Sequence, residues 1–335
     1  MRTAIYGAGS MGTILGAYIT KNGGRIDLIN HNREHIAALR ERGAHITGNV
    51  DFIQPVVAYT NDMMSGRYDI FFLTTKQLNN KEVVSYLKPF LAPDGVIVTL
   101  QNGIPEHGIE AIVGPEHVLG CTAAWGATMT GPGVSELTSS PNALTFQLGS
   151  LSPFPNPHLQ HVKSMLELMG TVIVDDNFIG TRWSKLLINA SFSGVSTVLG
   201  NTFGEAVQNH RSRKVILTLI KECIDVCAKA GIRIEPIQGK DIVKLLDYKT
   251  PIKRYFSFLI LPITVRKHFH LTASMLQDIE HGKKTEVDAI NGMVSEYGRR
   301  VGCPTPMNDR IAELIHKIEN GELKPGVDNL KYLQV

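Results

Sequence analysis

The chain has few of the features that mark secreted or metal-binding proteins. Its 335 residues include only four cysteines, Cys121, Cys223, Cys227 and Cys303. They show neither metal-ligand spacing beside a histidine pair nor the pattern of a disulfide framework. We therefore expect small core cysteines in a reducing cytoplasm, and no bound metal.

Long hydrophobic runs are also missing. The most apolar stretch, Tyr255 to Val265, is too short to span a bilayer and contains Pro262. It predicts a buried or interface helix. The first apolar stretch of the chain carries a glycine motif where a signal peptide would have a cleavage site. Both observations favour a cytoplasmic protein with no membrane partner.

Excess charge of one sign is absent as well. The formal net charge is only +3, and the basic residues are scattered, with the densest cluster at 211–214. Such a pattern argues against nucleic acid as a partner. Apolar content of 43% and charged content of 19% are ordinary for a globular enzyme, and the length predicts two domains.

A glycine-rich turn stands at the start of the chain. The short apolar strand Thr3 to Tyr6 precedes it, and a helix is expected from Thr13 onward. Glycines let the backbone turn sharply and approach a pyrophosphate, and the helix that follows directs its N–H groups at the phosphates. The turn therefore predicts a dinucleotide site made by Gly7, Ala8, Gly9, Ser10, Met11 and Gly12.

The end of the second strand indicates which dinucleotide is bound. NAD enzymes usually place a carboxylate there for the ribose 2′-hydroxyl, but this chain has Asn30. His31 and Arg33, which follow, are neutral or cationic and suit a 2′-phosphate. Asp27, the nearby acid, lies inside the strand. These residues favour NADP(H) over NAD(H).

The hydrophobic patterning divides the chain into an α/β part and a helical part. Short β-branched runs alternate with amphipathic helices up to about residue 175, which predicts a doubly wound parallel sheet. Strands are expected at 3–6, 26–30, 69–74, 96–100, 118–123 and 171–174, with a hairpin-like extension from 133–137 and 143–148. Helices are expected at 179–200, 203–230, 240–247, 270–298 and 306–319. We place a dinucleotide-binding domain at 1–176 and a helical domain at 177–335.

Ligands of open parallel sheets bind at the carboxyl ends of the strands. Besides the glycine turn, two loops are expected there: the one with Thr75 and Lys76, and the one with Asn102. We therefore expect these side chains beside the cofactor.

Taken together, several motifs resemble the ketopantoate reductase family along nearly the whole chain. They are the glycine turn, Thr75-Lys76, Leu100-Gln101-Asn102-Gly103, Lys185-Leu186-Leu187-Ile188-Asn189, Ser274-Met275-Leu276-Gln277-Asp278, Thr285-Glu286-Val287-Asp288 with Ile290-Asn291-Gly292, and Pro304-Thr305-Pro306. The resemblance implies a Rossmann-like domain followed by a helical domain similar to the C-terminal part of 6-phosphogluconate dehydrogenase. It also implies NADPH-dependent reduction of 2-dehydropantoate to (R)-pantoate.

The resemblance also implies roles for single residues. Lys185 matches the general acid, and Glu286 its acidic partner in the substrate site. Asn102 and Asn189 match positions that contact substrate or nicotinamide, and Ser274 matches one that holds the substrate carboxylate. Lys76 and the residue at the end of the second strand match positions near the cofactor phosphate.

The chemistry of the residues agrees with these roles. Hydride arriving at a ketone carbon leaves an alkoxide, which needs a proton donor within hydrogen-bond reach. Lys185, Asn189 and Ser193 are four residues apart, so one helix face is expected to present an ammonium, an amide and a hydroxyl in a row. Ser274 and Glu286 are expected to share one face of a second helix.

The chain also departs from the family pattern. Ser193 stands where a second asparagine is usual, and His31 where an arginine is common, with Arg33 two residues on. The segment from about 238 to 270 is longer than in compact members, and it is expected either to cover the active site or to form a homodimer contact. Two alternatives stay open: a reductase of another small 2-oxo acid, and a non-catalytic NADP-sensing regulator.

Overall fold

A computed structural model describes residues 1–153, 155–237 and 239–334. Residue 238, where the expected insertion begins, and residue 335 therefore lie outside the described part. The chain divides into two compact units, each with its own core. The first comprises Met1–Gln101 and Pro105–Phe178, and the second comprises Asn102–Ile104 and Ile179–Val335.

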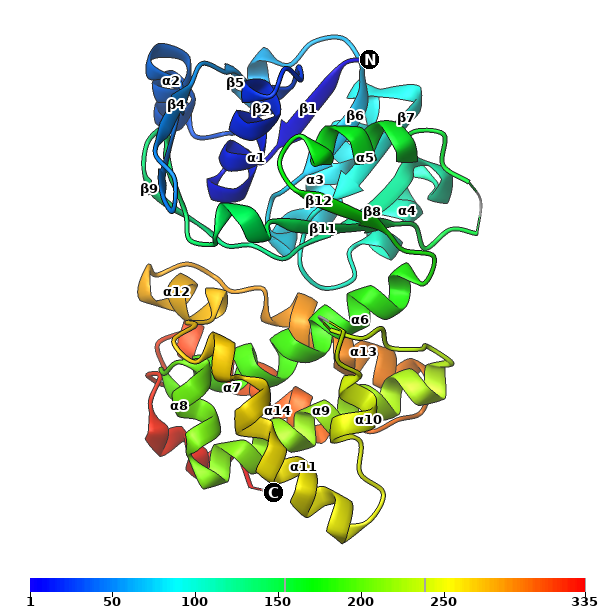
Figure 1. The fold of residues 1–335 in the computed structure, drawn as a ribbon, viewed down its shortest axis with the longest axis vertical. Coiled ribbons are helices and arrows are strands. Elements are labelled where there is room, and N and C mark those ends of the chain that lie inside the picture. The colour runs from blue at the N-terminus through cyan, green and yellow to red at the C-terminus, as the bar shows by residue number, and fades with distance from the viewer. Residues whose placement is uncertain (154, 238, 335) are drawn as a thin grey trace. The chain divides into compact units, whose positions relative to one another are not determined.

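The first unit is built on an eight-stranded sheet of order β12-β11-β8-β7-β6-β1-β2-β5 (Figure 1). The six strands from β5 to β8 in this order are parallel, while β11 runs antiparallel to β8 and pairs in parallel with β12. The strands are β1 (Thr3–Tyr6), β2 (Asp27–Ile29), β5 (Val57–Tyr59), β6 (Tyr68–Leu73), β7 (Leu91–Thr99), β8 (Val118–Ala123), β11 (Thr145–Gly149) and β12 (Thr171–Val174).

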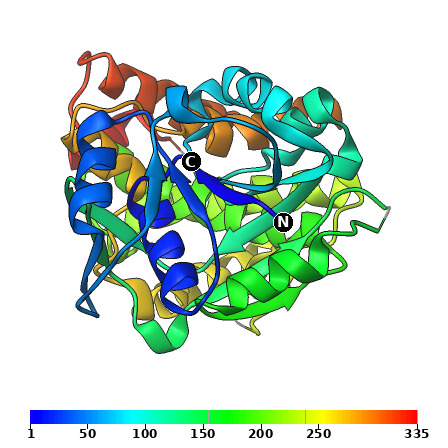
Figure 2. The same ribbon diagram turned by 90° about the horizontal axis from the view of Figure 1, so that it is seen from above.

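Helices cover both faces of this sheet because successive strand residues point to opposite sides. Ile5 packs with α1 (Ser10–Lys21), α2 (Arg33–Arg42) and α5 (Leu159–Glu167). Its neighbours Ala4 and Tyr6 pack on the other side with α3 (Asn80–Leu87) and α4 (Glu106–Val113). Seen from above, the dark blue α1 and the green α5 lie on one side of β1, and cyan helix on the other (Figure 2). The predicted doubly wound sheet is confirmed.

A second, four-stranded sheet corrects the predicted hairpin. Its order is β4-β3-β10-β9, with bounds β3 (Ala44–Gly48), β4 (Phe52–Gln54), β9 (Ala127–Gly131) and β10 (Val134–Leu137). β10 pairs with β9 and β3, whereas β11 pairs with β8 and β12 in the large sheet. The hairpin prediction was wrong because β3, β4 and β9 are short and half exposed, so their sequences show no clear strand pattern.

The second unit is helical in its described residues, apart from one isolated bridge between Ile237 and Lys240. Its longest helix, α9, begins after the N-cap Asn209 and packs against α11, α13 and α14. The helices are α6 (Phe178–Ile188), α7 (Gly194–Leu199), α8 (Phe203–Gln208), α9 (His210–Ala230), α10 (Ile242–Leu246), α11 (Pro251–Thr264), α12 (Ser274–Glu280), α13 (Met293–Arg300) and α14 (Pro306–Glu319). Short 3₁₀ segments lie at 61–63, 77–79, 88–90, 115–117, 141–143, 266–268 and 327–332.

Three predicted helices are interrupted. The expected helix 203–230 breaks at Asn209, whose extended backbone separates α8 from α9. The expected helix 179–200 contains a π-helical segment, η6 (Asn189–Ser193), between α6 and α7. The expected helix 270–298 is divided in two. Its first part, α12, ends at Glu280, and the chain turns at Gly282, which has φ +65°. Its second part begins with another π segment, η8 (Asp288–Gly292), which leads into α13. Ser274 and Glu286 therefore do not share a helix, which corrects that prediction.

Helix α11 contains the most apolar stretch of the chain. Ser257 and Leu261 are its buried residues, whereas one face carries Ile252, Tyr255, Phe256, Leu259 and Ile263 at 45% to 72% exposure. The expectation of a buried helix was therefore wrong for this face, and the interface reading remains. Within the described ranges, no helix has the length and apolarity needed to cross a bilayer.

Candidate active site

The glycine turn follows β1 and is pressed against the loop after β6. The backbone amides of Gly7 and Ala8 both donate to the Ile29 carbonyl, at 2.9 Å. Gly7 has φ +89°, and a Cβ on it would lie 2.5 Å from Cγ2 of Thr75. Thr74 Oγ1 donates to the Gly7 carbonyl at 2.8 Å. A glycine is therefore required for the turn to approach this loop, as the sequence predicts.

Gly9 faces open space instead of protein. A Cβ on Gly9 would meet only the Gly7 carbonyl oxygen, at 3.7 Å. Gly9 is also the N-cap of α1, and among the described residues no side chain caps this helix. The first-turn N–H groups and the positive end of the helix are thus available to an anion. This geometry fits the pyrophosphate of a dinucleotide.

A buried histidine that the sequence did not single out holds the turn in place. The backbone amide of Gly133 donates to Nδ1 of His35 at 3.0 Å, so the proton of a neutral ring lies on Nε2. Nε2 is 3.2 Å from Thr13 Oγ1, which donates to the Ala8 carbonyl at 3.3 Å. Burial lowers the pKa of His35 despite the opposing hydrogen bond to the backbone at Ala8. The chain of hydrogen bonds therefore requires a neutral imidazole.

The end of β2 carries the residues expected to choose between the cofactors. Asn30 is buried, and its Oδ1 accepts from the Asn32 amide at 2.9 Å. His31 and Arg33 are exposed, and Arg33 pairs with Asp62 at 3.2 Å. Hydrogen bonds from the Thr60 side chain and from the backbone lower the pKa of Asp62, and the charge of Arg33 lowers it further. This carboxylate was not predicted from the sequence, and its charge is paired with that of Arg33.

The loop after β7 meets the loop after β6 through Gln101. Its Nε2 donates to the Thr75 carbonyl and to Asn80 Oδ1, both at 2.9 Å. Lys76 is exposed at the start of the 3₁₀ segment that follows Thr75. The two loops thus converge at the carboxyl edge of the sheet, as predicted for a ligand site.

In the second unit, Lys185 lies half buried on α6, and Asn189, also half buried, opens the π segment η6. Ser193 ends that segment and is buried, and its carbonyl accepts from Thr197 Oγ1 at 2.7 Å. The α-helix on which the expected row of Lys185, Asn189 and Ser193 rests becomes π-helical from Asn189 to Ser193. The row itself stays a prediction.

Asn102 and Glu286, 184 residues apart in the chain, are in direct contact within the second unit. The Asn102 Nδ2 donates to Oε2 of Glu286 at 3.1 Å. Glu286 is only 8% exposed, which makes it one of the few buried carboxylates of this unit. Ser274, by contrast, is exposed at the first position of α12. The structure therefore brings two of the predicted substrate-site residues together.

The segment around Glu286 is fixed on both sides by α14. The Thr285 amide donates to Glu319 at 2.6 Å, and His316 bridges Asp288 at 2.9 Å and Glu319 at 3.1 Å. Burial disfavours a charged His316, but the hydrogen bonds and charges of Asp288 and Glu319 outweigh it and raise the pKa of this histidine. The His316 ring, whose raised pKa favours the imidazolium form, therefore anchors the residues beside Glu286 through two carboxylates.

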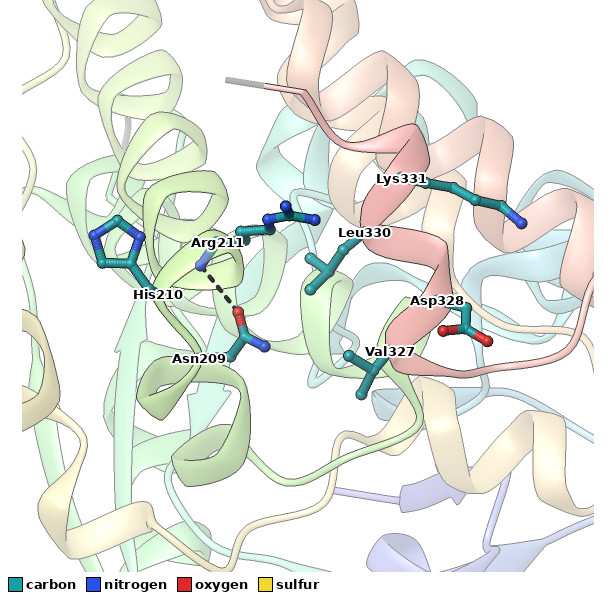
Figure 3. A pocket seen from close by; sticks show the side chains of 7 residues that line it. All are labelled: Asn209, His210, Arg211, Val327, Asp328, Leu330 and Lys331. Atoms are coloured by element: carbon teal, nitrogen blue, oxygen red, sulfur yellow. Dashed lines mark hydrogen bonds between the residues drawn. The ribbon is translucent and has the colours of Figure 1, made fainter.

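A surface cavity of about 700 Å³ lies elsewhere in the second unit, where α9 begins beside the 3₁₀ segment 327–332 (Figure 3). Its lining is Asn209, His210, Arg211, Val327, Asp328, Leu330 and Lys331. Asn209 Oδ1 accepts from the amides of Arg211 and Ser212, so the helix start is already capped. None of the predicted site residues lines it. In the described part of the chain, no group of three histidine, cysteine or acidic residues is arranged to hold a metal ion.

A glycine turn shaped for a dinucleotide, joined to a helical unit with a lysine and an amide-bound carboxylate, defines a nicotinamide-dependent oxidoreductase. Comparison with known proteins gives the family. Residues 3–150 match the model described as ketopantoate reductase PanE/ApbA, and residues 177–319 match its C-terminal model. The chain belongs to the ketopantoate reductase family.

Individual relatives cover nearly the whole chain. The 2-dehydropantoate 2-reductase of Pyrococcus horikoshii is 26% identical over 96% of this chain and 98% of its own length. That of Streptococcus pyogenes serotype M6 is 26% identical over 95% and 98%. Among solved structures, a D-mandelate dehydrogenase with NADH and anilino(oxo)acetate has a TM-score of 0.80 at 23% identity, covering 96% of this chain and 99% of that one. A PanE/ApbA family ketopantoate reductase from Ralstonia eutropha has a TM-score of 0.81 at 22% identity, covering 96% and 99%. These two structural similarities describe the fold.

Proposed function

We propose that this oxidoreductase reduces 2-dehydropantoate to (R)-pantoate with NADPH, a step of pantothenate and coenzyme A synthesis. The observation that carries the proposal is the contact between Asn102 and Glu286, because it joins two residues to which family resemblance assigns substrate and catalytic roles. The relatives named as 2-dehydropantoate 2-reductases support the choice of substrate.

In this proposal the two parts of the chain have different functions. Residues 1–176 bind the cofactor through the glycine turn with Thr75, Lys76, His31 and Arg33, and residues 177–335 carry the catalytic groups. When bound, the nicotinamide supplies the hydride to the ketone carbon. Lys185 holds a proton within reach of the ketone oxygen, and its transfer leaves a hydroxyl and a neutral amine that solvent protonates again.

Glu286 and the amides serve the substrate side of the reaction. Because Asn102 donates to one oxygen of Glu286, the carboxylate is held in one orientation. A carboxylate in the same substrate site favours the ammonium form of a lysine, the form that donates the proton. Asn189 and Ser193 supply hydrogen bonds to the substrate, and Ser274 binds its carboxylate. Asn102 would also help to hold the nicotinamide when the cofactor is bound.

Turnover with a panel of 2-oxo acids tests the activity. We expect NADPH consumption to be fastest with 2-dehydropantoate, beside pyruvate, 2-oxoisovalerate and oxaloacetate. A rate only with another member of the panel would make this a sister reductase, an outcome that Ser193 in place of asparagine favours, since serine lacks an amide donor. Binding of NADPH with no turnover of any acid would make the protein an NADP-sensing regulator.

The preference for NADP(H) rests on the neutral and cationic residues after β2. We expect NADP(H) to bind more tightly than NAD(H) by about 1 to 3 kcal/mol, the worth of one or two charge-assisted contacts. Asp62→Asn should widen this margin because it releases Arg33. Asp51→Asn, which removes an exposed carboxylate paired with His45 in the same unit, should leave it unchanged. Equal affinities for both cofactors in a titration would overturn the preference.

We also propose a cytoplasmic homodimer that uses the exposed face of α11. Five large apolar side chains on one helix face, each at least 45% exposed, form a patch typical of an interaction surface. Phe256→Asp should convert a dimer to a monomer in size-exclusion chromatography with light scattering. A wild-type monomer at all concentrations would contradict the proposal.

A further inference from the structure

The two π-helical segments both lie beside predicted site residues. η6 begins at Asn189, one turn after Lys185, and η8 begins two residues after Glu286. Single-turn π segments are often found at functional sites, and they shift the carbonyl acceptors out of the regular α-helical pattern. Carbonyls in such segments depend on donors from elsewhere in the fold.

One side chain joins the two segments. Asn291, within η8, is 0% exposed, and its Nδ2 donates to the Ala190 carbonyl in η6 at 2.9 Å. The same nitrogen donates to Oδ1 of Asn308 on α14 at 3.0 Å. Both amide protons of Asn291 are thus used, one across to η6 and the other to α14.

The fold makes room for this amide. A Cβ on Gly194, the first residue of α7, would lie 3.0 Å from Oδ1 of Asn291 and 2.9 Å from Cγ2 of Ile311. Gly194 therefore permits the close approach of the Asn291 side chain to the end of η6. An alanine at this position would push the amide away from its partners.

A buried carboxylate, that of Glu222, fixes the other end of this series of hydrogen bonds. Asn308 donates from Nδ2 to Oε2 of Glu222 at 2.7 Å and from its backbone to the same oxygen at 3.0 Å. The Met307 amide donates to Oε1 at 2.8 Å. Burial raises the pKa of Glu222, while these three donors act to lower it. With Nδ2 held by Glu222, Oδ1 of Asn308 is turned toward Asn291.

We propose that Asn291 is a positioning residue that sets the backbone of η6 and η8, and through them Asn189 and Glu286. The inference rests on the proposed reductase function, because it assigns those two residues to the substrate site. Ala190 directly follows Asn189, and Asn291 lies five residues after Glu286, so one amide ties both segments to a single buried anchor. Asn291 acts without touching the substrate.

Asn291→Leu tests the proposal, with Asn329→Leu as a matched control. Asn329 is also buried, and its Nδ2 donates to the carbonyls of Val198 at 3.0 Å and Lys324 at 2.8 Å. Both variants lose the two hydrogen bonds of a buried amide nitrogen and should be less stable. Only Asn291→Leu should lower kcat/KM for the 2-oxo acid by at least about tenfold, since small displacements of reacting groups are costly. The Kd for NADPH should not change.

A milder variant and a second readout complete the test. Gly194→Ala displaces the amide without removing it and should lower kcat/KM severalfold, which keeps the proposal testable if Asn291→Leu does not fold. Amide hydrogen exchange should rise in residues 189–193 and 286–292 of Asn291→Leu, and not in the control. This readout holds even if no 2-oxo acid is a substrate, so the two proposals fail separately. A folded Asn291→Leu with wild-type kcat/KM and exchange would overturn the inference.

Discussion

Each of the two units holds its functional segment with side-chain hydrogen bonds, but the charges of the groups that make them differ. In the first unit a neutral histidine, His35, connects two backbone groups and supports the glycine turn. In the second unit the anchors are ionisable pairs and carboxylates: His316 between Asp288 and Glu319, and Glu222 at the start of α14. The glycine turn is thus supported by a neutral ring, whereas the segment of Glu286 is supported by charged groups. Changes in the first unit should therefore alter cofactor affinity, and changes in the second should alter turnover.

The largest effect is expected from Lys185→Ala in the helical unit. Loss of the general acid should lower kcat by at least about a hundredfold, the lower range for such a group. The Kd for NADPH, measured by fluorescence titration, should stay within about twofold, because the glycine turn belongs to the other unit.

Lys284→Ala removes an exposed lysine of the same unit and serves as the control, with turnover unchanged. A near-normal kcat for Lys185→Ala would remove this lysine from the mechanism. A large loss of NADPH affinity would instead break the division between the two units.

Gly9→Ala should have the reverse pattern of Lys185→Ala, with its main effect on NADPH binding. Its Cβ would meet little protein and occupy the space expected for the pyrophosphate, so the Kd for NADPH should rise by about tenfold with little change in thermal stability. Gly108→Ala also adds a methyl group where no atom lies within 4 Å, and it should leave the Kd unchanged. Equal effects of both variants would show that Gly9 does not face the cofactor.

The smallest effects are expected from His35 and His316, whose contributions to stability should depend on pH in opposite directions. The folded pKa of His35 lies below 6.5, so the unfolded chain binds the proton more readily and stability falls as the pH drops below 6.5. The folded pKa of His316 lies above 6.5, so its stabilisation is complete below that pH and is lost as the pH rises through the folded pKa. Urea midpoints between pH 5 and 9, roughly the range in which histidines titrate, should show the acid loss reduced in His35→Gln and the alkaline loss reduced in His316→Gln. Parallel curves for wild type and both variants would contradict the assignment.

The sequence predicted the parts of the fold that have a local signal. β8, β12 and α14 lie at their predicted residues, because apolar periodicity and a proline at the helix start mark them. The π segments were not predicted, since they differ from α-helix in hydrogen-bond spacing and not in composition. The small sheet was missed because its edge strands are three to five residues long and pair across distant parts of the chain.

The candidate site likewise contains residues that the sequence predicted and residues that it did not. The glycine turn follows from its motif, and Asn102 and Glu286 from family resemblance. His35 and Asp62 were not expected, because their roles depend on partners that only folding brings near: Gly133 for His35 and Arg33 for Asp62. Asn291 belongs to one of the family motifs, but its role depends on a contact with Ala190 that spans 101 residues.

The wide turn at Asn189 to Ser193 amounts to one surplus residue inside a helix. A turn closed by hydrogen bonds to the fifth residue accommodates the surplus residue within itself, so the helix resumes beyond it with its faces nearly unchanged. Deleting one residue there would restore regular winding and alter the backbone around Asn189, while Lys185, one turn earlier, would keep its direction. A library of single deletions across this stretch would therefore separate the contribution of the wide turn from that of the lysine.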